Sequence, residues 1–469
     1  MKIAIFSDFL HPELSGVSDS VKNLSCALAD LGHTVMIVAP AYSKSDYKII
    51  GSLKKEINLG PNIIIKRLPS FSVPFSPTGQ NRFPLFLGKG IYLMWKFKPD
   101  IIHTNSPLVP GIEAFISSKL FKIPFIGTNH TPVSEFVKGP KWFVRLICRY
   151  WSWFYNMCDF VSTPSQFLID YMRNHGFNSH KAIPISNPID ISKFSPAENI
   201  SQKNELKKKF GFSKYTALFA GRLAEEKHVD DIIRAISLVK KEIPEISLVL
   251  TGHGKDEGRM KELSKELGIL DAVHFLGFVD EKTYPLIFKA SDIFTIMSTA
   301  ESQGMSMILA MASGLPIIAA KARGLPEFID NQNGLLVEIG DYKDLAKKII
   351  ELLKDQKLSK KMGENGIIFA SKLSSDSIGK VWEKIYSDTL TGTNSYIKSK
   401  HKISLIIPAY NEEKYIGSCL DHAIKNSGGK FSEIIVVDNV STDSTKSLAE
   451  RRPGVRVIRE ERKIGRAHV

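Results

Sequence analysis

The sequence has few cysteines, and their arrangement excludes two common uses of that residue. The four cysteines are Cys26, Cys148, Cys158 and Cys419. Their positions show neither the spacing of a metal site nor a paired pattern. We therefore expect reduced thiols in a cytoplasmic protein, with no disulfide framework and no metal site.

Long apolar runs are also missing from the sequence. No stretch reaches the roughly 20 apolar residues that a membrane-spanning helix needs, so any membrane contact is expected to be peripheral, on the inner face. The N-terminal segment MKIAIFSDFL lacks the long apolar core and the cleavage site of a signal peptide. It is better interpreted as a buried first strand.

Acidic residues are outnumbered by basic ones, 49 to 63, which gives a formal net charge of +14. This excess attracts anionic partners, such as an acidic membrane surface, nucleic acid or phosphorylated small molecules. Because the basic residues are scattered and no base-reading module is recognisable, nucleic acid is not expected as a partner. With 43% hydrophobic residues, the chain is expected to fold rather than remain disordered.

Strand and helix patterns alternate along the 469 residues and predict more than one domain. KIAIFSDF, a helical stretch and TVMIVAP form a strand–helix–strand unit, which is typical of parallel sheets. A second series begins after a proline-rich segment near residue 186. We expect an α/β fold with two Rossmann-like, doubly wound domains facing across a cleft, over residues 1–185 and 186–390.

The end of the chain forms a third pattern. Residues 391–402 are polar and basic and are expected to be a linker, and residues 403–469 begin another α/β unit that is incomplete. The ending IGRAHV can be back-translated as sequencing-adapter sequence, so we expect the natural gene to continue past Val469.

Polar residues follow the predicted strands of the second series, where ligands of open parallel sheets bind. Glu301 follows SDIFTIMS, and the helix that starts near Gly304 is expected to offer free N–H groups to an anion. Arg222 and Lys227 follow TALFA and suit a diphosphate, although most such pairs are solvated surface cations. Gly16 lies in the matching loop of the first series and allows close approach of a phosphate, or is simply a turn residue.

Taken in order, five segments resemble the family-four retaining glycosyltransferases of the GT-B fold, over residues 1 to about 390: GVSDSV, TNHTP, FAGRLAEEK, FLGFV and ESQGMSMILAMASGLP. The resemblance implies that Arg222 and Lys227 bind the diphosphate of a nucleotide-sugar donor. The Gly16 loop and the backbone of Gly304 and Met305 would lie beside it. No metal or other cofactor is implied.

The same resemblance assigns roles to the remaining candidates. Phe278 and Val279 would border the nucleotide base, and Glu301 would accept hydrogen bonds from the donor sugar. His130 would lie beside the reacting sugar on the acceptor side, so the implied catalytic set consists of Glu301, His130, Arg222 and Lys227. An isolated histidine is more often a structural residue of the core than a catalytic one. For His103, both a structural and a functional role stay open.

One position departs from the family pattern. The family usually carries Glu-x7-Glu, in which the second acid contacts the ribose, but eight residues after Glu301 this sequence has Leu309. Loss of a hydrogen bond to a charged group costs about 1.5 to 3 kcal/mol, or roughly 10 to 100-fold in donor affinity. We therefore expect a weaker or altered nucleotide site.

The acceptor is indicated by residues 138–160, which contain three of the five tryptophans. On a helix, several apolar side chains would share a face opposite the cations: Phe143, Leu146, Ile147, Tyr150, Phe154 and Met157, against Lys141, Arg145 and Arg149. Such a helix can lie on an anionic membrane surface. Alternatively, its apolar face packs into the first domain. Within the family the sequence looks most like members that glycosylate diacylglycerol or phosphatidylinositol.

The third pattern resembles the opening of a family-two glycosyltransferase of the GT-A fold. The matching positions are Pro408, Asn411, Glu412, Asp438 and Asp443, of which Asp438 would contact the nucleotide. The later motifs of that family are missing, so no second transferase activity is expected.

The sequence thus predicts a glycosyltransferase that moves a sugar from a nucleotide-diphosphate sugar to a lipid or glycan acceptor with retention. A transferase with a soluble acceptor, a sugar-nucleotide epimerase and a non-catalytic sugar-nucleotide binder stay open as alternatives.

Overall fold

The computed structural model describes residues 1–49, 56–73, 80–137, 139–178, 182–393, 403–426, 431–452 and 454–461. The chain divides into a unit of Met1–Thr391 and a unit of Gly392–Val469. Lys138, most of the expected linker and the ending IGRAHV lie outside the described residues.

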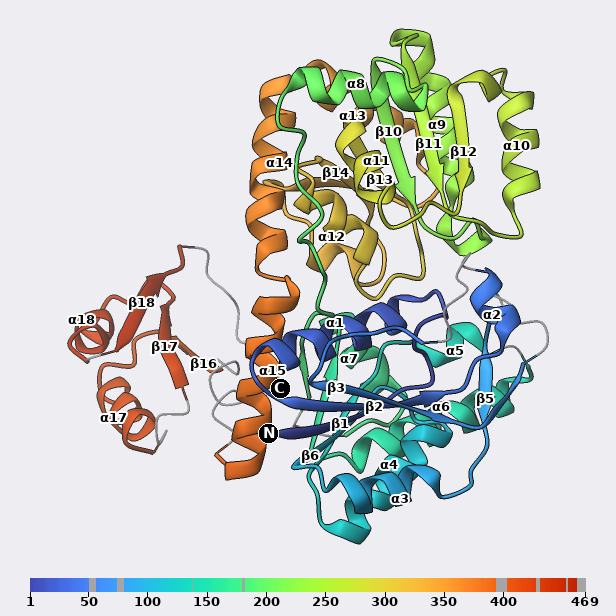
Figure 1. Ribbon diagram of the computed structural model, residues 1–469. Coiled ribbons are helices and arrows are strands. Elements are labelled where there is room, and N and C mark those ends of the chain that lie inside the picture. Colours follow the sequence, from blue (N-terminus) through green and yellow to red (C-terminus); the bar gives the residue numbers. More distant parts are fainter. Residues whose placement is uncertain are drawn as a thin grey trace. The chain divides into compact units, whose positions relative to one another are not determined.

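The larger unit contains two parallel sheets, so the expected two-Rossmann α/β fold is confirmed (Figure 1). The first sheet has seven strands in the order β3-β2-β1-β6-β7-β8-β9. The strands are β1 (Lys2–Phe6), β2 (Thr34–Pro40), β3 (Ile63–Leu68), β6 (Ile101–Thr104), β7 (Phe125–Thr128), β8 (Phe160–Thr163) and β9 (Ala182–Pro184). A short antiparallel pair accompanies it, β4 (Ser70–Ser72) with β5 (Arg82–Pro84).

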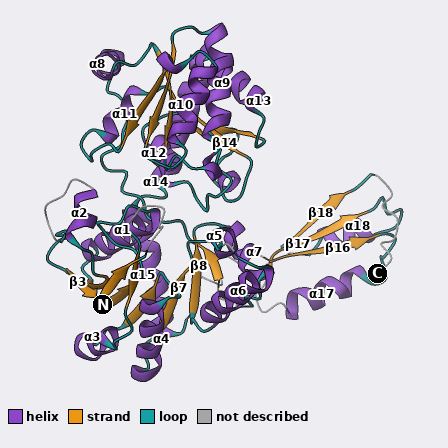
Figure 2. Cartoon of the chain, turned by 90° about the vertical axis from the view of Figure 1, so that its right-hand side faces the viewer, coloured by secondary structure: helices purple, strands orange, loops and turns teal. Residues whose placement is uncertain are grey.

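The second sheet has six strands in the order β12-β11-β10-β13-β14-β15. They are β10 (Tyr215–Ala220), β11 (Ile246–Thr251), β12 (Val273–Gly277), β13 (Ile293–Ile296), β14 (Ile317–Ala320) and β15 (Gly334–Val337). The central strands β10 and β13 are buried almost throughout because helices cover both faces of a parallel sheet. Figure 2 shows helices flanking the strands of each sheet.

The helices follow the apolar periodicity of the sequence. Those of the first sheet are α1 (Gly16–Asp30), α2 (Lys44–Ile49), α3 (Lys89–Phe97), α4 (Val109–Phe121), α5 (Val133–Phe136), α6 (Lys141–Asn156) and α7 (Gln166–Asn174). Those that follow are α8 (Ile200–Phe210), α9 (Val229–Glu242), α10 (Glu257–Glu266), α11 (Tyr284–Ala290), α12 (Met305–Ala312), α13 (Tyr342–Lys354), α14 (Gln356–Ser371) and α15 (Ser375–Thr391). Within the described residues, every helix is too short or too polar to cross a bilayer.

Helix α15 follows the second sheet in sequence but packs against helix α1 of the first. A Cβ atom on Gly379 would lie 2.7 Å from the Cβ of Ala27, which shows how closely the two helices approach. His33 Nε2 lies 3.0 Å from Glu383 Oε1 at the same contact. The chain therefore passes between the two sheets twice, and the boundaries expected near residues 186 and 390 stay predictions.

The smaller unit has one parallel sheet in the order β16-β17-β18. Its elements are β16 (Ile403–Ala409), α17 (Ile416–Asn426), β17 (Phe431–Asp438), α18 (Thr445–Glu450) and β18 (Val455–Arg459). Its core is small and includes Leu420, Val436 and Ala449. The expected third α/β unit is thereby confirmed.

Candidate active site

The centre of the site is an ion pair between two loops of the second sheet. Lys227 ends the short 3-10 helix η1 (Glu225–Lys227) after β10, and Glu301 lies in the loop after β13. Strands β10 and β13 are hydrogen-bonded neighbours, so their carboxyl ends place both side chains together. Lys227 Nζ lies 2.5 Å from Glu301 Oε1 and 3.4 Å from Ser298 Oγ.

Arg222 lies at the same end of β10 and is held by a second carboxylate. Its guanidinium donates to Glu226 Oε1 at 2.5 Å, and both side chains are partly exposed. The carbonyl oxygen of Glu226 accepts a hydrogen bond from Thr299 N at 2.9 Å, which ties this loop to the Glu301 loop. Two cations are thus fixed in the loop that follows β10, an arrangement that suits a diphosphate.

Helix α12 begins directly after the Glu301 loop. Its N-cap residue Gly304 has a positive φ of 79°, a conformation that glycine adopts without strain. A Cβ on Gly16, the first residue of α1, would lie 3.1 Å from the sulfur of Met305. The structure therefore brings together the two glycines and the first turn of α12, whose N–H groups favour an anion.

His130 follows β7 of the first sheet and contacts the Glu301 loop. Its carbonyl oxygen accepts a hydrogen bond from Ser302 Oγ at 3.0 Å, and its Nε2 lies 2.8 Å from Asn105 Oδ1. Burial lowers the pKa of His130 to about 4. The imidazole is therefore neutral near pH 7 and acts as a hydrogen-bonding group without charge.

His103, by contrast, is a core residue. Its side chain is fully buried, with Nδ1 2.7 Å from Tyr386 Oη and Nε2 2.8 Å from Thr128 Oγ1. Burial lowers the pKa of His103 to about 3. Both ring nitrogens are occupied inside the protein, which favours the structural interpretation.

Phe278 and Val279 lie apart from the ion pair. They follow the edge strand β12, which β11 separates from β10. Phe278 is 51% exposed, whereas Val279 packs against the second core. The Phe278 side chain is accessible at this edge of the sheet, and a role in binding the base stays a prediction.

Comparison with known proteins identifies the family. Residues 14–193 match the model described as Glycosyltransferase Family 4, and residues 202–369 match Glycosyl transferases group 1. The chain is 33% identical over 301 residues to N-acetyl-alpha-D-glucosaminyl L-malate synthase of Bacillus anthracis, which covers 62% of this chain and 75% of that protein. The chain belongs to the family 4 glycosyltransferases. It is a nucleotide-sugar-dependent enzyme, as the sequence predicted.

Two further similarities extend over most of this glycosyltransferase. It is 29% identical over 409 residues to alpha-monoglucosyldiacylglycerol synthase of Streptococcus pneumoniae, covering 84% of this chain and 87% of that protein. It superposes on the crystal structure of Anabaena HepE in complex with UDP-glucose with a TM-score of 0.64 and 19% sequence identity. The superposition covers 84% of this chain and 100% of that chain. The latter similarity confirms the GT-B fold. Residues 404–468 match Glycosyl transferase family 2, which confirms the expected partial domain.

Leu309 occupies the position of the usual second glutamate in this glycosyltransferase. It lies in α12 and packs, partly buried, against the second core. The side chain therefore contributes to packing and carries no hydrogen-bond acceptor, and an altered nucleotide site stays a prediction.

Several polar residues of the site were missed by sequence reasoning. The N–H of Asn187 donates to Gln303 Oε1 at 2.8 Å, and its Oδ1 accepts from Ser20 Oγ at 3.0 Å. These buried contacts join the segment between the sheets to α1 and to the loop before α12. The signal was weak, because an Asn before a proline is usually interpreted as a turn.

Two buried carboxyl groups after β1 were also missed. Ser106 Oγ donates to Asp8, and Ser15 Oγ donates to Glu13 at 2.6 Å. Burial raises the pKa of both Asp8 and Glu13 to about 7. For Asp8, the available signal was the polar pair Ser7–Asp8 directly after the first strand.

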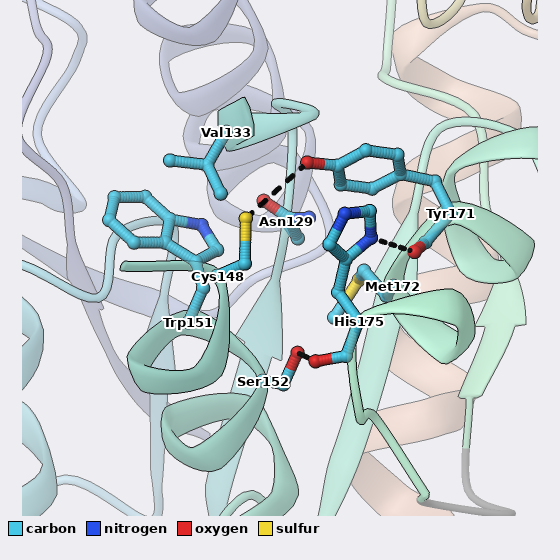
Figure 3. A pocket seen from close by; sticks show the side chains of 8 residues that line it. All are labelled: Asn129, Val133, Cys148, Trp151, Ser152, Tyr171, Met172 and His175. Carbon is cyan, nitrogen blue, oxygen red and sulfur yellow. Dashed lines mark hydrogen bonds between the residues drawn. The ribbon is translucent and has the colours of Figure 1, made fainter. Parts of the chain in front are cut away.

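A small pocket lies between α6 and α7, next to the segment that carries His130 (Figure 3). Its lining includes Asn129, Cys148 and Trp151, and the His175 ring lies tilted against the Tyr171 ring with centroids 4.4 Å apart. Neither Lys227 nor Glu301 lines it. Among the described residues, no group of three or more His, Cys, Asp or Glu side chains could hold a metal ion.

Proposed function

We propose that this glycosyltransferase moves a hexose from a nucleotide-diphosphate sugar to a hydroxyl of a diacylglycerol-type lipid, with retention of anomeric configuration. The observation that carries the proposal is the Lys227–Glu301 ion pair, which lies beside the start of α12 and in the loop that contacts His130. Cations, helix N–H groups and a sugar-binding carboxylate thus meet in one place.

This geometry supports the donor half of the proposed reaction. Arg222 and Lys227 bind the diphosphate together with the first turn of α12, and they stabilise the charge that grows on it as the bond to the sugar breaks. Lys227 also fixes Glu301, which accepts hydrogen bonds from the sugar hydroxyls. The new bond joins the anomeric carbon to the acceptor oxygen, and the acceptor proton leaves with the diphosphate.

The acceptor half lies on the first sheet. Neutral His130 suits a site beside the reacting sugar, because it can accept or donate a hydrogen bond without competing for the diphosphate. The hydrogen bond from Ser302 Oγ to the carbonyl oxygen of His130 joins the loop after β7 to the loop of Glu301, which supports this role.

A lipid acceptor is supported by the surface of helix α6. Its N-terminal half exposes Trp142 at 69% and Leu146 at 58%, while Phe154 in its C-terminal half is buried. Arg145 and Arg149 are exposed on the same helix. Exposed aromatic side chains next to cations suit an anionic headgroup layer.

A second exposed apolar surface supports the same proposal. Residues 82–99 contain no acidic side chain. Six large apolar side chains in this segment are 41 to 64% exposed: Phe83, Leu85, Phe86, Leu87, Tyr92 and Trp95. The similar protein of Streptococcus pneumoniae is named for a glycolipid product, which agrees with a lipid acceptor.

Product analysis tests the proposal. Purified protein is incubated with UDP-glucose and vesicles that contain diacylglycerol, and UDP release and the anomeric configuration of the product are measured. Acceptor-dependent UDP release with an α-linked product supports the proposal. An epimerised donor without acceptor would indicate an epimerase, and donor binding without turnover a non-catalytic binder.

A soluble acceptor is the second candidate. It is favoured by the 33% identity to a protein that is named for a glucosaminyl L-malate product. UDP release that depends on a soluble hydroxy acid, and not on vesicles, would select this alternative.

A further inference from the structure

We propose that Glu327 is a positioning residue, which holds the Glu301 loop in place by binding the N-terminus of helix α7 in the first sheet. The inference rests on the proposed role of Glu301. Glu327 ends the 3-10 helix η3 (Leu325–Glu327), which follows β14.

The carboxylate of Glu327 takes the place of a helix cap. Its two oxygens accept hydrogen bonds from Gln166 N at 2.7 Å and Phe167 N at 2.6 Å, the first two residues of α7. The N-cap residue Ser165 makes no capping hydrogen bond with its own side chain. A carboxylate at this position satisfies two free N–H groups and interacts favourably with the helix dipole.

Arg323 strengthens the same contact. Its guanidinium lies 5.4 Å from the centroid of the Phe167 ring, and its Nε donates to Thr299 O at 3.1 Å. The residue has a positive φ of 54°, which is uncommon for a side chain other than glycine. Such a conformation persists only where surrounding contacts hold it.

The segment of Arg323 and Glu327 is bound tightly to the Glu301 loop. Gly324 N donates to Glu301 O at 3.1 Å. A Cβ on Gly324 would lie 2.1 Å from Ser302 O, so the two backbones meet where only glycine fits. A displacement at Glu327 is therefore transmitted to the backbone of Glu301.

Helix α7 is thus connected to Glu301 through a series of direct contacts. Glu327 and Arg323 bind α7, while Arg323 and Gly324 bind the loop of residues 299–302. Loss of the Glu327 carboxylate is expected to loosen the loop without removing any group that touches the donor. Turnover should fall more than donor affinity.

Hydrogen–deuterium exchange tests the contact without any acceptor. In the full-length protein, Glu327→Ala should accelerate exchange at the amides of Gln166, Phe167 and Gly324 by about 10-fold or more, while Glu327→Gln, which keeps one acceptor oxygen, should give an intermediate rate. Glu338→Gln is the matched control, because Glu338 is 67% exposed and pairs with Lys321. Unchanged exchange at these amides in both Glu327 variants would overturn the proposal.

Kinetics separate positioning from general stability. In Glu327→Ala, kcat should fall by roughly 10-fold with the Kd for UDP-glucose within about twofold of the wild type, and Glu327→Gln should recover part of kcat. An unchanged kcat despite faster exchange would also overturn the proposal. A wild type that transfers no sugar to diacylglycerol would contradict the proposed acceptor instead, and exchange at Gly324 would still decide whether Glu327 holds the Glu301 loop.

Discussion

Lys227 Nζ and Glu301 Oε1 are 2.5 Å apart, although 74 residues separate them in sequence. Each side chain follows one of two neighbouring strands, β10 and β13, and each is largely shielded from solvent. In the proposed reaction, the pair fixes a cation for the diphosphate and a carboxylate for the sugar in one arrangement.

Replacement of Lys227 by Met should lower kcat for transfer by roughly 100 to 1,000-fold, the range found when one preorganised group that stabilises transition-state charge is removed. The variant also leaves the Glu301 carboxylate without its partner, so donor affinity should fall. Steady-state kinetics with UDP-glucose and isothermal calorimetry measure both effects. Lys321→Met, at a 61% exposed position in the same part of the chain, is the control and should change neither.

A glutamate at position 309 tests the altered nucleotide site. If the position faces the ribose, Leu309→Glu should tighten binding of UDP by roughly 10-fold or more, because it restores a hydrogen bond to a charged group. Leu309→Met preserves the apolar packing and should leave the affinity unchanged. Equal affinity in both variants would show that the position does not contact the ribose.

The α6 surface should bind anionic vesicles in a salt-sensitive manner. Arg145→Ala combined with Arg149→Ala should weaken binding by roughly 10 to 30-fold, since each cation near such a surface contributes about 1 kcal/mol. The matched control replaces Lys354 and Lys360 by alanine. Both lysines are exposed and follow the second sheet in sequence, and this variant should bind as the wild type does. Cosedimentation with vesicles measures the difference, and equal binding by both double variants would exclude α6 as the contact.

Asp8 should make stability depend on pH. Its folded pKa of about 7 lies above the ordinary value of 3.8, so the folded state holds the proton more tightly. Its contribution to stability is therefore present below pH 4 and is lost as pH rises to about 7. Asp8→Asn should raise Tm at pH 8, by on the order of a few °C, more than at pH 5.

Thermal melts at these two pH values measure that difference. Asp376→Asn, at a 75% exposed position, should give the same small change at both. A Tm change for Asp8→Asn that does not depend on pH would show that the buried carboxyl does not titrate as stated.

Much of the fold and part of the site could be predicted from the sequence. Short apolar runs such as TALFA specified the strands, and polar residues at strand ends indicated Lys227 and Glu301. The contacts of Asn187 and Glu327 could not be predicted, because they join segments more than 100 residues apart and leave no local periodicity. His103 stayed ambiguous, because its neighbours along the chain do not reveal that Tyr386 of α15 covers it.

Helix α6 shows a similar limit. Periodicity placed Phe143 and Leu146 on one face with Phe154, but the structure exposes the first two and buries the third. Periodicity alone does not give the part of a helix that packs against the sheet.

The most direct test of the central claim compares the wild type with Lys227→Met and Glu301→Gln in one assay. UDP release from UDP-glucose is measured with and without diacylglycerol vesicles, and UDP affinity is measured in parallel. We expect acceptor-dependent release by the wild type, loss of at least about 100-fold in kcat in both variants, and weaker UDP binding only in Lys227→Met. Full turnover by either variant would contradict the account.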